Sequence, residues 1–163
     1  MRLSRLVSLV LARLKDEAGS DHLNERYIYG SLNFSGGRNM HVANPPNEER
    51  KPPYKRRDVS LTGEEEVGGD YLLFVDAPHD MWTFLEDYDT RGELEARILG
   101  GGGLTNPFVG CMIAIVDGEP KDYELTYFDE SAGARKRFAK SEQDADPNPF
   151  GRKYPELELR WLG

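Results

Sequence analysis

The sequence predicts a single α+β domain spanning residues 1–163. We expect a four-to-six-stranded, mainly antiparallel sheet with an N-terminal helix and a second helix packed on one face. Three observations predict this class: a helical apolar stripe near the N-terminus, two short apolar runs rich in β-branched residues, and an alternating run at the C-terminus. A chain of 163 residues is long enough for one hydrophobic core.

The N-terminal stripe predicts a helix over residues 2–18. Its apolar residues recur at the spacing of three and four that places them on one helical face. Arginines and a lysine occupy the other face. The residues of the stripe are Leu3, Leu6, Val7, Val10 and Leu14.

A hairpin is expected at the centre of the chain. Residues 108–116 are almost wholly apolar, as in a strand covered on both faces. Asp117, Gly118 and Pro120 then favour a tight turn. The run 123–128 alternates apolar and polar residues and is predicted to be the second strand of the hairpin.

Four further segments complete the expected sheet and its helices. Residues 26–32 and 156–161 are predicted strands, and residues 59–62 are expected to pair with 71–77 as a hairpin. Residues 79–99 are predicted to be helical with an interruption. The Thr90–Glu93 spacing matches a capping box, so a fresh helix is expected to begin at Arg91.

Residues 33–58 form a long stretch in which glycines and four closely spaced prolines exclude helix and central strand. A loop of this length is uncommon inside a compact domain. Two interpretations remain open: a mobile excursion, or an arm that lies on a neighbouring subunit.

The distribution of charge predicts assembly. The net charge is −8. Residues 1–60 carry eleven Lys or Arg against seven Asp or Glu, whereas residues 61–163 carry ten against twenty-two. Such a split suggests contact between unlike faces, either of two copies or of one copy and a partner of opposite charge. The predicted contact residues are Arg50, Lys51, Tyr54, Lys55, Arg56, Arg57, Glu64, Glu65, Glu66 and Asp70.

The same basic cluster, with Tyr54 inside it, also suits contact with nucleic acid. The acidic remainder of the chain would repel a polyanion, so salt bridges between subunits are favoured. The single Cys111 excludes a disulfide-stapled secreted domain, and no apolar run is long enough to cross a bilayer. A reducing cytoplasm is the expected compartment.

Catalytic motifs are weak. Asp76, His79 and Asp80 cluster after a predicted strand, where they are either metal ligands or a strand-end cap followed by a helix start. His22 and His41 are expected in unrelated loops. Asp117, Glu119 and Lys121 share one turn, which does not fit a nuclease site, and the four glycines from Gly100 lack the Lys of a phosphate loop. No cofactor or metal is predicted.

The order of elements resembles that of the tail-terminator and head–tail joining proteins of long-tailed bacteriophages. The similarity lies in the opening helix Leu3–Leu14, the run VSLTGEEEVGGDYLLFVDAP with the later helix ELEARIL, and the terminal strand ELELRWL. The chain departs from the family pattern in residues 33–58 and 81–88.

The resemblance implies a non-enzymatic virion protein that forms a homo-oligomeric ring, hexameric in that family, and is assembled in the host cytoplasm. Two alternatives remain open. One is an acidic immunity or inhibitor-type protein that binds a basic toxin or nuclease, and the other is a small metal-dependent enzyme using Asp76, His79 and Asp80. The inhibitor's contact surface would comprise Glu64, Glu65, Glu66, Asp70, Glu86, Asp87 and Asp89.

Overall fold

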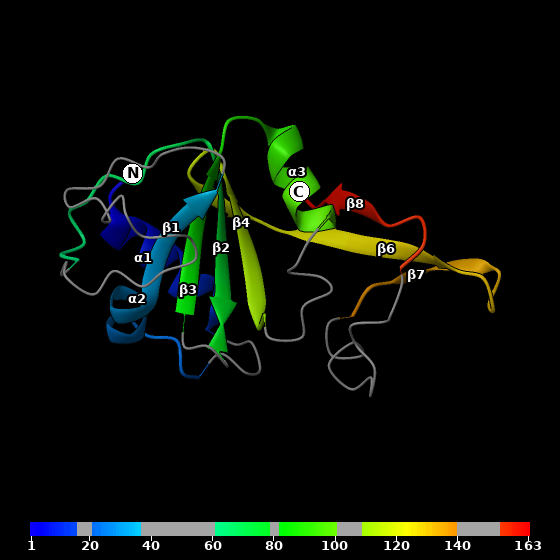
Figure 1. Ribbon diagram of the computed structural model, residues 1–163, viewed down its shortest axis with the longest axis horizontal. Coiled ribbons are helices and arrows are strands. Elements are labelled where there is room, and N and C mark those ends of the chain that lie inside the picture. The colour runs from blue at the N-terminus through cyan, green and yellow to red at the C-terminus, as the bar shows by residue number, and fades with distance from the viewer. Residues whose placement is uncertain (16–20, 37–60, 79–81, 101–108, 140–153) are drawn as a thin grey trace.

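The computed structural model describes residues 1–15, 21–36, 61–78, 82–100, 109–139 and 154–163. Within these ranges the chain forms three helices and eight strands in two sheets (Figure 1). The predicted α+β class with an N-terminal helix is confirmed.

The larger sheet has five strands in the order β1-β3-β2-β4-β5. Their bounds are β1 Leu32–Gly36, β2 Tyr71–Ala77, β3 Trp82–Tyr88, β4 Cys111–Val116 and β5 Glu119–Lys121. Only β1 and β3 run parallel to each other, and every other neighbouring pair is antiparallel. The prediction of a mainly antiparallel sheet is therefore correct.

The central strand β2 is buried on both faces of this sheet. Leu72 and Phe74 point to one face, whereas Leu73 and Val75 point to the other, because side chains alternate along a strand. Strands β3 and β4 occupy the two edges of β2. The continuous apolar run YLLFV follows from this double burial.

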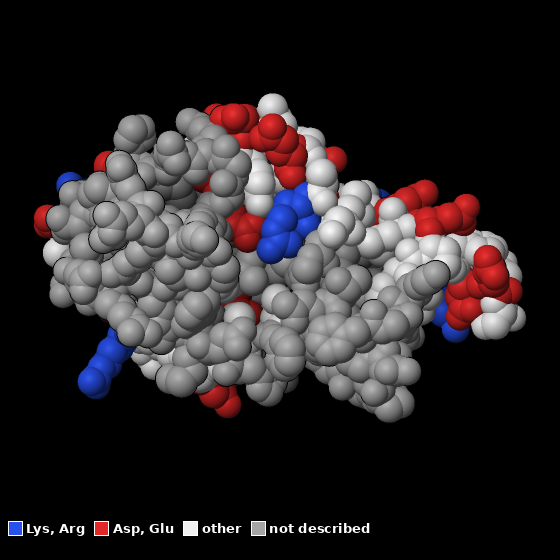
Figure 2. Space-filling view, in the orientation of Figure 1, with Lys and Arg blue, Asp and Glu red and all other residues white. Residues whose placement is uncertain are grey.

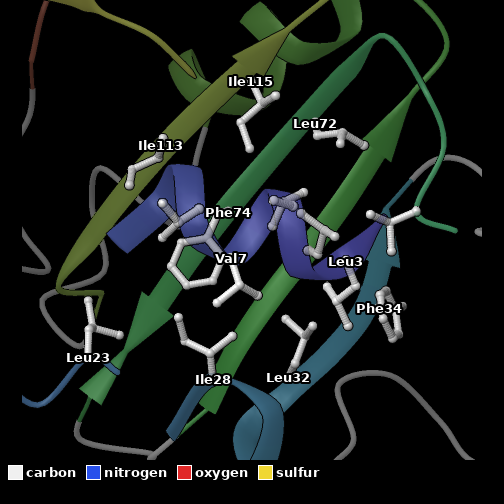
Figure 3. Close-up of a cluster of buried hydrophobic side chains, with 14 of the residues drawn as sticks. Leu3, Val7, Leu23, Ile28, Leu32, Phe34, Leu72, Phe74, Ile113 and Ile115 are labelled. Atoms are coloured by element: carbon white, nitrogen blue, oxygen red, sulfur yellow. The ribbon is translucent and has the colours of Figure 1, made fainter. Parts of the chain in front are cut away.

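Helices α1 (Leu3–Leu14) and α2 (Glu25–Ser31) contribute to the core on the face to which Leu72 and Phe74 point, which we call the first face. The predicted stripe of α1 is confirmed, since all five of its residues are buried. Figure 3 shows the side chains of Val7 and Ile28 beside Phe74 and that of Leu3 beside Phe34, with Ile113 and Ile115 of β4 in the same cluster.

Residues 61–67 form an irregular segment that holds the start of α1. The first helical N–H groups have no partner within a helix. Here the Leu3 N–H donates to Glu65 O and the Ser4 N–H donates to Gly63 O, each at 2.8 Å. The predicted hairpin of 59–62 with 71–77 is wrong, because β3 and β4 already occupy both edges of β2; residues 59 and 60 lie outside the described ranges.

Helix α3 (Arg91–Leu99) packs on the opposite face through Leu94 and Ile98. Its predicted start is confirmed, since the Glu93 N–H donates to the hydroxyl of Thr90, and the Asp89 N–H donates to Glu93. The helix expected before it is wrong where the structure describes it: residues 82–88 are strand β3. Thr83 and Leu85 are buried toward the first face, which is the alternation of a strand.

The strand expected over residues 26–32 is also corrected, because residues 25–31 form α2 and β1 begins only at Leu32. Asn24 caps α2 by accepting a hydrogen bond from the Tyr27 N–H at 2.9 Å. The predicted irregular stretch 33–58 begins inside β1, and its residues 37–58 lie outside the described ranges.

The central hairpin differs from expectation in its second strand. Strand β4 pairs with the three-residue β5, which contains Pro120, and β6 (Tyr123–Asp129) belongs to another sheet. That smaller sheet has the order β7-β6-β8, with β7 at Ala134–Arg137 and β8 at Glu158–Trp161. The predicted C-terminal strand is confirmed. The sheet projects away from the five-stranded sheet (Figure 1).

The base of the projecting sheet joins the core on the α3 face. Leu125 is buried there, and Leu159 and Trp161 pack against the same cluster. The ring of Trp161 meets that of Tyr123 edge to face at 5.7 Å, and its Nε1 donates to Glu95 of α3 at 2.8 Å. Farther out, the ring of Tyr154 meets those of Tyr127 and Phe138 edge to face.

We expect Gly69→Ala to destabilise the fold by about 1–3 kcal/mol. Gly69 has a φ of +121°, and a Cβ there would lie 2.1 Å from Oδ1 of the buried Asp87. Urea unfolding measures the loss. Gly68→Ala is the matched control, because a Cβ at Gly68 would meet nothing within 4 Å. Equal effects of the two substitutions would contradict this account.

Candidate functional site

The predicted contact surface is only partly within the described ranges. The basic cluster, residues 50–57, lies outside them. Glu64, Glu66 and Asp70 are exposed, as the prediction requires. Glu65 is 3% exposed, and its carboxylate accepts hydrogen bonds from residues of its own loop. The exposed part of the acidic contact surface therefore consists of Glu64, Glu66 and Asp70.

The carboxylate of Glu65 organises the segment that holds α1. It accepts hydrogen bonds from the Thr62 hydroxyl at 2.9 Å and from the Gly63 N–H at 3.1 Å, in addition to the Thr62 N–H. Burial alone would raise the pKa of Glu65, but these hydrogen bonds together outweigh it and hold the pKa below the usual 4.5. An ionised, buried glutamate thus fixes the irregular segment of residues 61–67.

Part of the charge asymmetry is satisfied inside one molecule. Arg5 of α1 pairs with Glu119 of β5 at 3.1 Å, and Arg13 pairs with Asp122 at 2.7 Å. These exposed pairs contribute little stability, about 0–1 kcal/mol each. They show that basic residues of the N-terminal helix already meet acidic residues of the same chain, so the charge argument for assembly depends on residues beyond this helix.

The acidic surface expected of an inhibitor is also smaller than predicted. Glu86 and Asp87 are buried, and Glu86 is held by Arg97 of α3 at 2.7 Å. Asp89 is exposed and lies beside the start of α3. Figure 2 shows acidic side chains gathered over the region of α3. Three of the seven residues proposed for that surface, Glu65 among them, are therefore unavailable to a partner.

Asp76 lies near the end of β2, where its side chain is almost fully buried. Nε2 of His22, which precedes α2, lies 2.8 Å from Asp76 Oδ2. An ionised carboxylate can only accept, so Nε2–H donates to Asp76. The expectation that His22 lies in an unrelated loop is wrong. His79 and Asp80 are outside the described ranges.

Tyr27 of α2 completes this cluster. Its ring meets that of His22 edge to face at 5.2 Å. Burial, followed by the negative charge of Asp76, raises the pKa of Tyr27 to about 12. The Tyr27 hydroxyl and Asp76 Oδ1 are both buried, and neither meets the geometric criteria for a hydrogen bond with a described group. The cluster is therefore polar and partly buried, with His22 reaching the surface.

A histidine oriented by a buried carboxylate has the arrangement used by general bases and by metal ligands. Within the described residues, no group of three His, Cys, Asp or Glu side chains is arranged to hold a metal ion. A signal in the sequence was available: an Asp inside the apolar run YLLFVDA needs a buried partner, and the chain has only three histidines.

The projecting sheet presents a second surface. All four residues of β7 are exposed, and three of them, Arg135, Lys136 and Arg137, are basic. The Phe138 N–H donates to Leu125 O at 2.8 Å. Because hydrogen-bonded pairs alternate along an antiparallel ladder, the N–H groups of Arg135 and Arg137 point away from β6. In the described part of the chain, no strand covers this edge of β7.

No helix among the described residues is both long enough and apolar enough to cross a bilayer. No family model matches the chain. No curated protein and no solved structure matches it either.

We expect Asp76→Asn to alter the pH dependence of stability. Burial raises the pKa of Asp76 above its usual 3.8, although the hydrogen bond and charge of His22 oppose the shift. A raised pKa in the folded state gives stability below pH 3.8 that is lost as the pH rises through the folded pKa. In urea unfolding, the stability of the wild type relative to the variant should therefore fall as the pH rises through that window. Parallel curves would contradict a raised pKa.

We expect Glu65→Gln to destabilise the protein by about 1.5–3 kcal/mol near pH 7, because hydrogen bonds to a charged acceptor are lost. The pKa of Glu65 is lowered, so this difference should be present above pH 4.5 and disappear as the pH falls through the lowered pKa. Chemical denaturation at several pH values measures it. Glu64→Gln, at an exposed neighbour, serves as the control and should be nearly neutral.

Proposed function

We propose that the chain is a non-enzymatic structural subunit that assembles with copies of itself into a ring, of the kind found at the tail or head–tail junction of a phage virion. The observation that carries the proposal is the projecting three-stranded sheet, whose β7 edge no described strand covers. Figure 1 shows this sheet reaching well beyond the strands and helices of the five-stranded sheet.

An uncovered strand edge offers backbone donors and acceptors to another chain. The basic side chains of β7 oppose pairing between two β7 strands, since like charges repel across a ladder. They favour a strand or loop that carries acidic residues. A contact between two different surfaces repeats from copy to copy and closes into a ring where the rotation allows.

Exposed acidic residues supply the other side of such a contact. Glu64, Glu66 and Asp70 lie on the segment between β1 and β2, far along the chain from β7. Glu66 is 65% exposed and pairs only at the surface, with the Met1 amino group. The basic β7 edge and these acidic residues are two different surfaces of one molecule. A contact between them is head-to-tail, so this arrangement is favoured over a two-fold symmetric one.

The acidic inhibitor remains the second candidate, because acidic side chains gather over α3 (Figure 2). Exposed acidic residues there include Asp89 and Glu93. It predicts a monomer that binds a basic partner in a salt-dependent manner. The small metal-dependent enzyme has less support, since Asp76 is engaged by His22 and buried.

Native mass spectrometry of Arg135→Pro and Arg135→Ala tests the proposed assembly. Proline removes the outward N–H of residue 135 and leaves the ladder to β6 intact. Alanine keeps that N–H and removes the Arg135 side chain, with its charge and its contacts to Thr126, Glu156 and Glu158. We expect wild type and Arg135→Ala to form oligomers that dissociate with added salt. Arg135→Pro should shift the equilibrium toward monomer at least tenfold.

A wild-type chain that stays monomeric at all concentrations up to about millimolar contradicts the proposed ring. Oligomers that are equally abundant in the proline and alanine variants would show that assembly occurs without the β7 edge. Circular dichroism of both variants controls for loss of the fold.

A further inference from the structure

A cleft of about 400 Å³ separates β4 from the start of β6, at the point where the projecting sheet leaves the five-stranded sheet. Among the described residues, apolar side chains from both sheets line it, with charged side chains at its rim. The apolar residues are Val109, Met112, Ile113, Ala114, Leu125 and Phe138.

One wall of the cleft is a piece of the β4 edge that no described strand covers. Strand β5 pairs with β4 only as far as Ala114, so among the described strands none pairs with Met112 on that side. The Asp117 N–H donates to Asp70 O at 2.8 Å. By the alternation of the antiparallel ladder, the Met112 N–H and C=O point away from β2 and toward the cleft.

Two cations at the rim carry no ion pair in the described part of the chain: Lys121 of β5 and Arg137 of β7. The other charges at the rim are matched, since Arg13 pairs with Asp122 and Glu124 pairs with Arg160. The cleft therefore combines an apolar floor, an open strand edge and an excess of positive charge.

We propose that this cleft binds an extended segment of a partner protein that carries apolar side chains flanked by carboxylates. The segment adds as a strand beside Met112, its apolar side chains lie on the floor, and its carboxylates meet Lys121 and Arg137. This is strand addition to a sheet edge, in which main-chain hydrogen bonds give affinity and side-chain pockets give specificity. The inference goes beyond ring formation, because it applies equally to a monomeric chain.

The probe is a fluorescein-labelled synthetic peptide with the sequence Glu-Val-Leu-Val-Asp, and fluorescence anisotropy measures its binding to the full chain. The matched probe has the same sequence with alternate backbone nitrogens methylated, which prevents strand pairing and keeps side chains and charge. We expect saturable binding of the first peptide and at least tenfold weaker binding of the methylated one.

Charge reversal tests the rim. Lys121→Glu and Arg137→Glu should each weaken binding at least tenfold, and added salt should weaken binding to the wild type. Arg26→Glu makes the same charge change on the exposed surface of α2 and should leave binding unchanged. Arg137→Ala, which removes the cation and adds no repulsion, should fall between the wild type and Arg137→Glu.

Three results would overturn the inference: no saturable binding up to about millimolar peptide, equal affinity for the methylated peptide, or equal losses in Arg26→Glu and Lys121→Glu. Native mass spectrometry of Lys121→Glu separates this inference from the proposed ring. A variant that still assembles but no longer binds peptide supports the cleft, and a wild type that assembles but never binds peptide overturns the cleft alone.

Discussion

The structure depends on the burial of β2 on both of its faces. Phe74 and Leu72 contact the layer formed with α1, while Leu73 and Val75 contact the layer formed with α3. Each such side chain contributes about 1.5–3 kcal/mol when it is fully buried. Burial of Leu72 and Phe74 requires α1 to pack against that face of the sheet. Residues 61–67 hold the first turn of α1 in this position through backbone hydrogen bonds. The acidic loop predicted as a contact surface thus also supports the core.

Much of the fold could be predicted from local patterns. The stripe of α1, the apolar run of β2, the Thr90 cap of α3 and the alternation of β8 each identify their elements, because burial or capping leaves a direct mark on neighbouring residues. Two elements were misassigned. Aromatic residues in 82–88 fit a helical cluster as well as a strand, and Gly30 in α2 weakened the helical signal that Asn24 supplies.

The candidate sites were harder to predict for a different physical reason. Asp76 was singled out, but its partner His22 lies 54 residues away and is brought to it only by the packing of the segment before α2. Likewise, the cleft beside Met112 exists because β6 does not pair with β4 and belongs to the projecting sheet. The alternating run 123–128 predicts a strand but does not indicate which strand it pairs with. Long-range pairing between β-strands leaves little local signature.

A single residue, Asp122, separates β5 from β6 and so joins the two sheets. Its carbonyl accepts the Leu162 N–H at 2.9 Å, and its carboxylate is bound by Arg13 of α1. With so short a connection, the projecting sheet has little slack relative to the rest of the molecule. A load applied at its far end, as a neighbouring molecule would apply, is transmitted through Asp122 directly to the N-terminal helix.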